Sequence, residues 1–297
     1  MSLGKKTNIY ELVLVGDADR PGLPEIMRGV LVNAGLQEKD VIESRIDGRI
    51  SVSSYFNVKR NAQKIEAKIR AGRLNKVAVR LRRLESRDWQ NKWKEDFRPF
   101  RLTRRIDVVP TAYRHSYRPK GRKKIYIDTV LAFGTGLHET TSFMAKLIEE
   151  TAGKFKNFLD VGTGSGILSL VAAFNGAEAV WAIDIDKSCV EVAQENFKAN
   201  AYSSAQLKVA DVGVWKTNQQ FDFVAANLIS DDLIRLKKKI FSLVKPGQYL
   251  ALSGISLENF SKVKKAFAAL PLRCVQIRQG SRWAAVLYQR TQRKTRT

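Results

Sequence analysis

The chain has 297 residues, of which 44% are hydrophobic, and its 52 Lys and Arg against 29 Asp and Glu give a formal net charge of +23. This length is natural for two domains, and no apolar run is long enough to span a bilayer. We read no export signal, and Cys189 and Cys274 are expected to be buried free thiols. With only two histidines a metal site is not expected. Composition therefore indicates a cytoplasmic protein that needs no metal and no membrane.

The first 87 residues alternate between strand and helix periods in the order βαββαβ. Strands are predicted at 8–15, 41–46, 50–55 and 77–84, and helices at 23–34 and 61–71. The first helix has apolar residues at Ile26, Val30 and Leu31, and Asp47-Gly48 between the second and third strands is typical of a hairpin turn. This order is the ferredoxin-like pattern, so residues 1–87 are predicted to form a small α+β domain without catalytic groups.

Residues 88–127 are predicted to be a basic linker or bridging element. A short helix is expected at 88–97 and two strands at 106–109 and 124–128. Between Arg98 and Lys124 the chain has ten basic side chains opposed only by Asp107. Such a field favours polyanions, and a contact between residues 98–124 and RNA is one interpretation. The other is the solvated surface of a generally basic protein, which composition alone favours.

Residues 128–297 alternate strands and helices as far as about Ala268, which predicts a parallel sheet covered by helices on both faces. The last two predicted strands, 273–279 and 284–289, are separated by Gly280-Ser281 and are expected to form an antiparallel hairpin. The predicted fold is therefore α/β, with a Rossmann-like sheet that follows the smaller domain.

The strongest local motif follows a predicted strand and opens a helix, with Asp160, Gly162, Gly164 and Gly166 at alternate positions. A dinucleotide fingerprint would place glycine or alanine at Ile167. The observed spacing instead suits S-adenosylmethionine, because the turn allows close backbone approach and Asp160 can reach the ligand's ammonium directly or through water. The alternative is a tight strand–helix turn with no ligand.

Two further strand ends carry polar side chains. Asp184 ends the next strand and is placed to accept both ribose hydroxyls, whereas Asp186 is expected to cap the helix at 187–200. Asp211 is an equally balanced choice between an adenine contact and a loop residue. Asn227 ends a buried strand at the edge where ligands bind in open α/β sheets, although asparagine there is often a turn residue. Residues 131–141 are predicted to be a loop leading into a helix around 142–150; Thr141 could face the ligand, and Thr140 or Thr141 could instead cap that helix.

Five segments in this order resemble the PrmA family, the methyltransferases of large-subunit ribosomal protein L11. They are Leu131–Thr141, Asp160–Leu168, Asp184–Asp186, Val224–Leu228 and Leu252–Ile255. The resemblance implies a seven-stranded class I methyltransferase sheet preceded by a ferredoxin-like substrate-recognition domain. It implies S-adenosylmethionine as cofactor, bound at Thr141, Gly162, Asp184 and Asn227. The chain departs from the family pattern at Thr129-Val130, Leu137, Glu139 and Thr163, so the loop near the methyl group is expected to differ in shape.

The resemblance implies methyl transfer to amino groups of a ribosomal protein, most of all L11, at a lysine side chain or the N-terminal amine. The Asn227 side-chain oxygen and the Leu228 backbone carbonyl would aim the amine. No general base is evident, and His138 is expected to be a loop hydrogen-bonding residue. An RNA methyltransferase is the alternative that the charge favours, but Asn227-Leu228-Ile229 lacks the Asn-Pro-Pro-aromatic clamp of base-amine enzymes. Two alternatives remain: a methyltransferase of another protein lysine, and a non-catalytic binding module with the same fold. The intact glycines and acidic residues of the cofactor motifs argue against the binding module.

Overall fold

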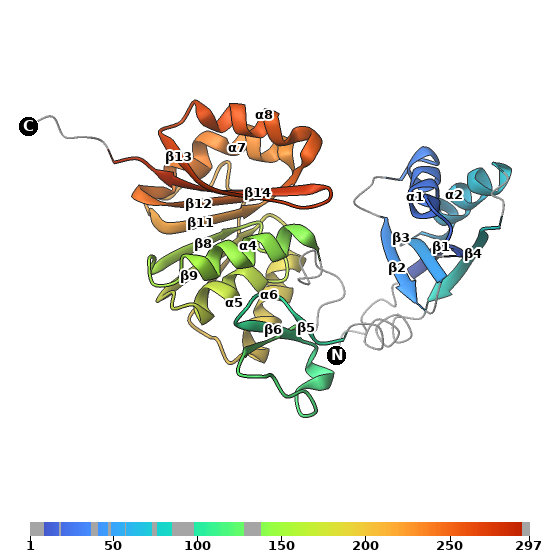
Figure 1. Cartoon of the computed structure of the whole chain (residues 1–297), viewed down its shortest axis with the longest axis horizontal. Helices are drawn as coiled ribbons and strands as arrows, with labels where there is room; N and C mark the ends of the chain where they lie inside the picture. Colours follow the sequence, from blue (N-terminus) through green and yellow to red (C-terminus); the bar gives the residue numbers. More distant parts are fainter. Residues whose placement is uncertain are drawn as a thin grey trace, which may run out of the picture. The chain divides into compact units, whose positions relative to one another are not determined.

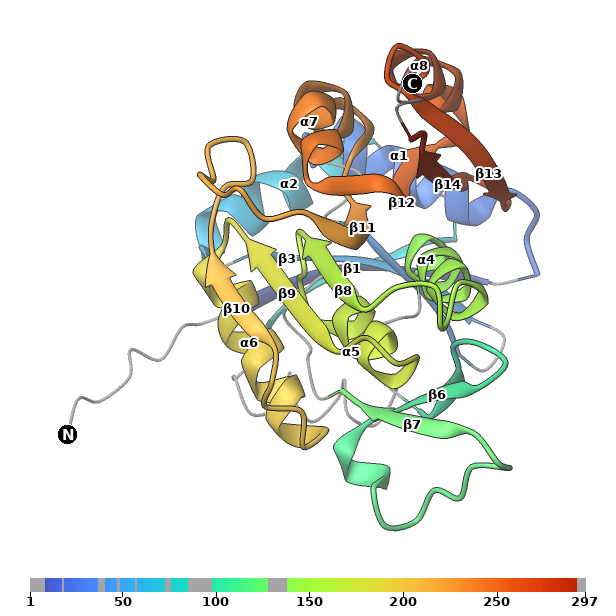
Figure 2. The ribbon, with the colours of Figure 1, turned by 90° about the vertical axis from the view of Figure 1, so that its left-hand side faces the viewer.

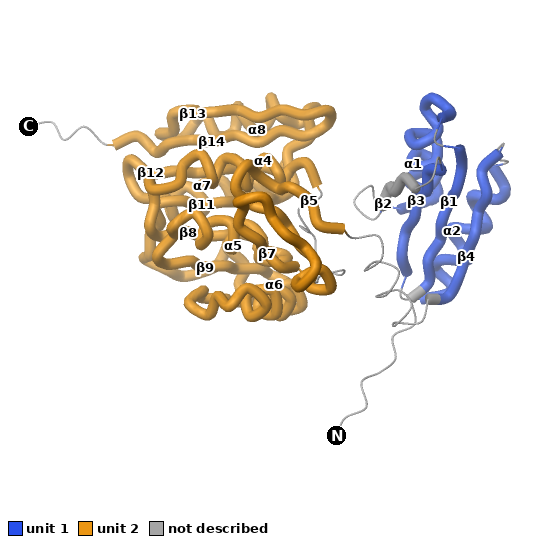
Figure 3. Tube along the Cα trace, turned by 60° about the horizontal axis from the view of Figure 1, so that its bottom comes forward, with its two compact units in different colours: residues 1–96 blue, residues 97–297 orange. Residues whose placement is uncertain are grey.

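The computed structural model describes residues 9–17, 19–36, 41–46, 49–56, 58–72, 76–84, 98–127 and 138–292. The chain divides into two compact units, Met1–Asp96 and Phe97–Thr297, coloured separately in Figure 3. The turn at Asp47-Gly48, the helix predicted at 88–97 and residues 131–137 of the predicted loop lie outside the described residues. The helix after that loop begins at Glu139, earlier than the predicted 142.

The first unit is a four-stranded antiparallel sheet in the order β2-β3-β1-β4, with two helices (Figure 1). Its elements are β1 (Ile9–Asp17), α1 (Leu23–Asn33), β2 (Ile42–Ile46), β3 (Arg49–Phe56), α2 (Lys59–Ala71) and β4 (Ala78–Leu84). The predicted βαββαβ order is confirmed. Since side chains alternate along a strand, Leu12 and Leu14 of β1 point to the same face and pack with α1.

Of the apolar residues noted in the sequence of α1, Ile26, Val30 and Leu31, only Leu31 is buried. Met27 and Leu31 are fully buried in the core of the unit, whereas Ile26 is 48% exposed. The buried residues Leu23, Met27 and Leu31 also have helical spacing, so periodicity alone could not decide which stripe faces the sheet.

The second unit is built on a seven-stranded sheet in the order β10-β9-β8-β11-β12-β14-β13. Its strands are β8 (Asn157–Val161), β9 (Ala179–Asp184), β10 (Gln206–Val209), β11 (Phe221–Asn227), β12 (Val244–Ser256), β13 (Leu272–Gln279) and β14 (Trp283–Arg290). Strands β8 to β12 pair in parallel, and β14 runs antiparallel to both neighbours, which confirms the predicted terminal hairpin.

Helices cover both faces of this sheet, as predicted (Figure 2). One face is covered by α4 (Glu139–Glu150), α5 (Ile167–Phe174) and α6 (Lys187–Ala199), and the other by α7 (Ser230–Ser242) and α8 (Leu257–Ala268). Leu159 and Val224 pack in the cluster that includes α7 and α8, whereas their neighbours Phe158 and Phe223 stack with ring centroids 5.3 Å apart. Because the central strands β8 and β11 are buried on both sides, they are apolar almost throughout.

Residues 98–127 form a small sheet that belongs to the second unit. Its strands are β5 (Phe100–Arg101), β6 (Ile106–Val109) and β7 (Lys123–Tyr126). A 3-10 turn, η2 (Thr111–Tyr113), lies between β6 and β7. The Tyr126 backbone exchanges two hydrogen bonds with the Asn200 amide at 2.8 and 2.7 Å. Arg114 and Lys123 donate to the carbonyls of Ala199 and Phe174, at the C-terminal ends of α6 and α5. Part of the positive charge therefore attaches this sheet to helix ends that carry partial negative charge.

Asp107 is the one acidic residue of this stretch, and it is fully buried. It accepts hydrogen bonds from Arg122 Nε at 2.6 Å and from the Tyr117 hydroxyl at 2.8 Å. The bond to Asp107 raises the pKa of Tyr117, so the tyrosine stays a neutral donor. The small sheet is thus held around a buried ion pair.

Both cysteines are free thiols, but the expectation that they are buried is wrong. Cys274 is exposed on the edge strand β13, and Cys189 is half-buried on α6 with its pKa raised to about 11 by burial. Within the described ranges no helix is long and apolar enough to cross a membrane, and no group of three or more His, Cys, Asp or Glu side chains could hold a metal ion.

The buried ion pair of the small sheet generates a stability prediction. Asp107→Ala leaves a partly buried guanidinium without its carboxylate, so the free energy of unfolding should fall by about 2–4 kcal/mol. Arg104→Ala is the matched control, because its side chain is 79% exposed and 4.0 Å from Glu149. Glu149 is itself buried but keeps its hydrogen bonds from the Thr103 hydroxyl and the Arg105 N–H, so losing this exposed guanidinium should cost less than about 1 kcal/mol. Chemical denaturation of both variants measures the difference, and equal losses would contradict the assignment.

Candidate functional site

The sheet order brings the carboxyl ends of β9, β8 and β11 next to one another. The turn after β8 is joined to the end of β9, because the backbone N–H groups of Gly162 and Thr163 both donate to the Ile183 carbonyl, at 2.9 and 3.0 Å. Three of the predicted site segments therefore meet at one edge, where open α/β sheets bind their ligands.

The glycines at this edge are required first by the backbone. Gly162, Gly164 and Gly166 have φ values of 73°, 54° and 78°, in the left-handed region that favours glycine. A Cβ on Gly162 would lie 2.6 Å from the Leu228 side chain, and one on Gly166 would lie 2.7 Å from the Phe197 ring. Close packing of the turn against the β11 end and against α6 therefore needs glycine, whatever the turn also binds.

The carboxylate of Asp184 connects two loops. One oxygen accepts from the Gly164 N–H at 3.0 Å and the other from the Asp186 N–H at 3.0 Å. Each carboxylate oxygen can accept more than one bond, so capacity for a further ligand remains. Next to it, Ile185 is 71% exposed, an apolar side chain at the site that sequence reasoning missed. Asp186 accepts from the Ser188 N–H and caps α6, as predicted.

Asp160 is 1% exposed, and its carboxylate is only half satisfied. One oxygen accepts from the hydroxyls of Thr163 at 2.9 Å and Ser169 at 2.8 Å. The other has no hydrogen-bond partner among the described residues. Burial raises the pKa of Asp160 to about 6, against the effect of these two bonds and with a smaller contribution from the Asp184 charge. The two hydroxyl partners were not predicted, since nothing in their spacing marks them.

The start of α4 contributes the next group of side chains. The helix is capped by the His138 ring, which accepts from the Thr140 N–H, so the alternative that Thr140 or Thr141 is the cap is wrong. Thr140 and Thr141 are buried, and the Asn227 amide nitrogen donates to the Thr140 hydroxyl at 3.3 Å. The Asn227 amide oxygen and the Thr141 hydroxyl are buried with no partner in the described part of the chain.

The Leu228 backbone is positioned by the neighbouring strand β12. Its N–H donates to the Ser253 carbonyl at 3.2 Å, and its carbonyl lies against Gly254, where a Cβ would collide with it. The role of this carbonyl as an acceptor for an amine stays a prediction. Asp211 accepts from the Gly213 N–H at 2.8 Å within its own turn.

Comparison with known proteins agrees with this geometry. The model of the family "Ribosomal protein L11 methyltransferase (PrmA)" matches residues 27–291. A ribosomal protein L11 methyltransferase of Geotalea daltonii is 36% identical over 214 residues, 68% of each chain, and one of Streptococcus uberis is 32% identical over 259 residues, 82% of this chain and 80% of that one. The structure of a ribosomal protein L11 methylase from Lactobacillus delbrueckii subsp. bulgaricus is 29% identical, with a TM-score of 0.60, covering 66% of this chain and all of that one.

The seven-stranded sheet with its one reversed strand and its glycine turn has the fold of class I methyltransferases, which use S-adenosylmethionine as methyl donor. Within that class the chain belongs to the ribosomal protein L11 methyltransferase (PrmA) family. The predicted fold class, family and cofactor are confirmed.

The half-satisfied carboxylate of Asp160 generates a pH prediction. Its pKa in the folded protein is about 6 against an ordinary 3.8, so the stability present at low pH is lost as pH rises through 6. The side chain introduced by Asp160→Asn cannot ionise. Between pH 5 and pH 7 the free energy of unfolding of this variant should therefore rise, relative to that of the wild type, by on the order of 1 kcal/mol. Urea unfolding at both pH values measures this change. Asp186→Asn is the control, because the exposed carboxylate of Asp186 has a lowered pKa. The difference in the free energy of unfolding between this variant and the wild type should stay constant from pH 5 to pH 7. Parallel pH profiles of wild type and Asp160→Asn would refute the prediction.

Proposed function

We propose that this chain transfers methyl groups from S-adenosylmethionine to amino groups of ribosomal protein L11, at a lysine side chain, the N-terminal amine or both. Family membership supports the reaction, and the buried unpaired oxygen of Asn227 at the end of β11 is the observation that supports an amine as acceptor. An incoming amine supplies the N–H donor that this oxygen lacks. The cytoplasm, where ribosomal proteins occur, is the proposed compartment.

The residues at the sheet edge fit the cofactor group by group. The unpaired oxygen of Asp160 suits its ammonium, directly or through water, and the Thr141 hydroxyl suits its polar amino-acid end. The Asp184 carboxylate would accept from the ribose hydroxyls, and the exposed Ile185 offers an apolar surface to adenine. The turn from Gly162 to Gly166 would let the ligand approach the backbone, because no Cβ intervenes. S-adenosylmethionine supplies the electrophilic methyl group.

The protein's part in the transfer is to present a neutral amine along the line of attack. A free lysine has a pKa of about 10.4, so the ammonium form must be disfavoured in the site. Burial at the β11 end does this, since desolvation penalises the charged form. The Asn227 oxygen, and the Leu228 carbonyl as a second acceptor, would hold the amine by its N–H groups and leave the lone pair for the methyl group. Such positioning can supply several kcal/mol of the barrier reduction.

The first unit supplies none of the side chains assigned to this site. We assign residues 1–87 to holding the protein substrate, as the family resemblance implies, and residues 128–297 to catalysis. An RNA substrate remains the alternative, but the end of β11 continues as Leu228-Ile229 and has no aromatic clamp for a base. A different protein lysine is the second alternative.

A methyl-transfer assay tests this function. With labelled S-adenosylmethionine and separate samples of purified L11, total ribosomal protein and ribosomal RNA, label is expected in L11. Asp184→Ala should weaken cofactor affinity by about 1.5–3 kcal/mol in calorimetry, as for a lost charge-assisted bond. Asp186→Ala is the matched control on the same loop. It should lose about 1 kcal/mol of stability with the helix cap but retain cofactor affinity.

The outcomes separate the alternatives. Label in RNA alone would establish the nucleic-acid alternative, and label in another ribosomal protein would overturn the choice of L11. Equal loss of cofactor affinity in Asp184→Ala and Asp186→Ala would show that Asp184 acts only through the loop.

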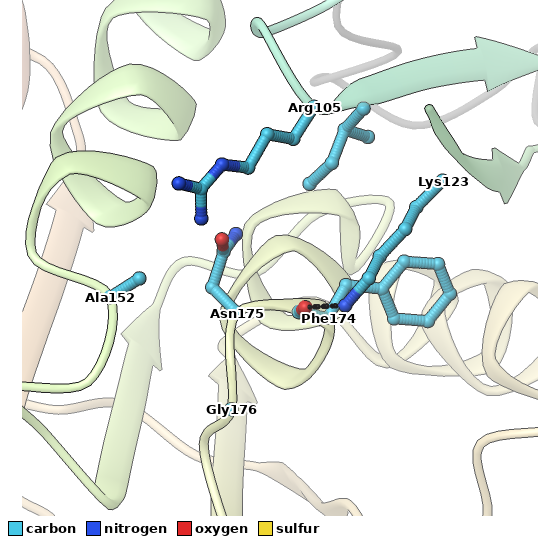
Figure 4. Close-up of a pocket in the computed structure, with 7 residues that line it drawn as sticks. Arg105, Lys123, Ala152, Phe174, Asn175 and Gly176 are labelled. Atoms are coloured by element: carbon cyan, nitrogen blue, oxygen red, sulfur yellow. Dashed lines mark hydrogen bonds between the residues drawn. The ribbon is translucent and has the colours of Figure 1, made fainter. Parts of the chain in front are cut away.

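We further propose that residues 98–124 contact RNA when the enzyme meets its substrate. Asp107 is neutralised by Arg122, and several cations of this stretch are exposed, among them Arg98, Arg105, Arg118 and Lys120. Figure 4 shows Arg105 and Lys123 at a pocket of about 330 Å³ between the small sheet and the C-terminal ends of α4 and α5. Exposed cations beside a hollow of this size suit the phosphate backbone.

Salt dependence tests the RNA contact. The double variant Arg105→Ala/Lys120→Ala should bind a ribosomal RNA fragment more weakly, with the slope of log K against log salt reduced by about 1 to 2. Lys264→Ala/Lys265→Ala removes the same charge from the exposed face of α8 and is the control. Fluorescence anisotropy across a salt series measures both. Identical slopes in the two double variants would mean that RNA responds only to net charge.

A further inference from the structure

A line of hydrogen bonds connects the start of α4 to the end of β11. The His138 ring nitrogen Nδ1 lies 2.7 Å from the Thr140 hydroxyl, and that hydroxyl lies 3.3 Å from the Asn227 amide nitrogen. Thr140 is fully buried. The line ends at the Asn227 amide oxygen, which is buried without a partner among the described residues.

The direction of these bonds follows from the helix cap. Nδ1 of His138 also accepts from the Thr140 backbone N–H at 3.4 Å, so Nδ1 carries no proton. The Thr140 hydroxyl must then donate its single hydrogen to Nδ1. Its lone pairs are left to accept from the Asn227 nitrogen.

This direction decides which way the asparagine amide faces. If the amide were rotated by half a turn, its oxygen would face the Thr140 oxygen with no hydrogen between them, because that hydrogen is already donated to His138. Two opposed acceptors in a buried place are unfavourable. The rotated amide would also present its NH₂ group, a donor, to an amine that needs an acceptor.

We propose that His138 and Thr140 are positioning residues that fix the direction of the Asn227 amide, so that its oxygen faces the methyl-accepting amine. This inference rests on the function proposed above. The acceptor at the site is thereby set by a histidine that does not itself touch the amine.

The surroundings of His138 favour the neutral ring that the hydrogen bonds from His138 to Asn227 require. Its ring lies edge-on to Trp283 of β14, with centroids 5.1 Å apart. Burial lowers the pKa of His138, Glu139 on its own helix opposes this, and Arg282 of the β13–β14 turn adds to it. The ring is therefore neutral at physiological pH.

Protonation of His138 would reverse the direction of these hydrogen bonds. A proton on Nδ1 would be donated to the Thr140 oxygen, the Thr140 hydrogen would turn to Asn227, and the amide oxygen would be drawn away from the site. Because the pKa of His138 is lowered, this occurs on the acid side of its ordinary value of 6.5. Activity should therefore contain an acid limb that belongs to His138.

Variants of Thr140 test the proposal. Thr140→Val keeps the shape and removes the hydroxyl, and kcat on L11 should fall about tenfold or more, as for one lost orienting bond. Thr140→Ser restores the hydroxyl and should recover most of kcat. Cofactor affinity and melting temperature should change far less than kcat in both. In the Asn227→Ala background, Thr140→Val should have no further effect on kcat, because the two residues act as one unit.

Variants of His138 supply a readout that a purely structural role would not move. In His138→Asn the side-chain oxygen takes the place of Nδ1, keeps the helix cap and does not titrate. It should retain more activity than His138→Ala, and its pH profile should lack the acid limb of the wild type. Wild-type kcat in Thr140→Val, or an unchanged acid limb in His138→Asn, would overturn the proposal.

Failure of the proposed function would look different. If the wild type labels no L11, the proposed function is wrong. The hydrogen bonds from His138 to Asn227 can still be tested without activity, by following the His138 ring nitrogens by NMR. Thr140→Val should then shift the Nδ1 resonance and the titration midpoint of His138, and unchanged values would contradict the hydrogen bond itself.

Discussion

The attachment of the turn after β8 to the end of β9 is the interaction on which the site depends. Gly162 and Thr163 donate to the Ile183 carbonyl, and Gly164 donates to the Asp184 carboxylate. These bonds join two neighbouring strands at their carboxyl ends, and left-handed glycines make the required turn. Since the turn also packs against Leu228 at the β11 end, a change in the turn would alter both the proposed cofactor site and the proposed acceptor site.

Several polar groups at this edge leave hydrogen-bonding capacity unused, which fits the proposed ligand site. Oxygens of Asp160, Thr141 and Asn227 are buried without partners among the described residues, and each unmet group costs about 1–3 kcal/mol. A ligand with donors at the right places recovers this energy on binding. The hydroxyls that surround these oxygens, those of Thr163, Ser169 and Thr140, are themselves satisfied and hold their partners in one orientation. The proposed site is therefore oriented without a ligand.

The cations of the basic stretch at 98–124 fall into two groups, those bonded within the fold and those exposed on the surface. Arg114 and Lys123 bind carbonyls at helix ends, and Arg122 pairs with the buried Asp107, so these cations are part of the fold of the second unit. Arg98, Arg105 and Lys120 remain on the surface. A count of charges cannot separate the two groups, because the helix ends that Lys123 and Arg114 reach lie 51 and 85 residues away along the chain.

Local spacing and contiguous motifs were enough to predict the order of the elements in both units, the terminal hairpin, the cap at Asp186 and the family. Which side chains contact one another could be seen only in the folded chain. The bond from Asn227 to Thr140 spans 87 residues, and the contact that requires glycine at 166 involves Phe197 on another helix. The cap at His138, the buried stripe of α1 at Met27 and the exposed Cys274 were likewise set by packing. Residue spacing fixes the period of an element, but the partner of each side chain is known only when strand order and helix faces are fixed.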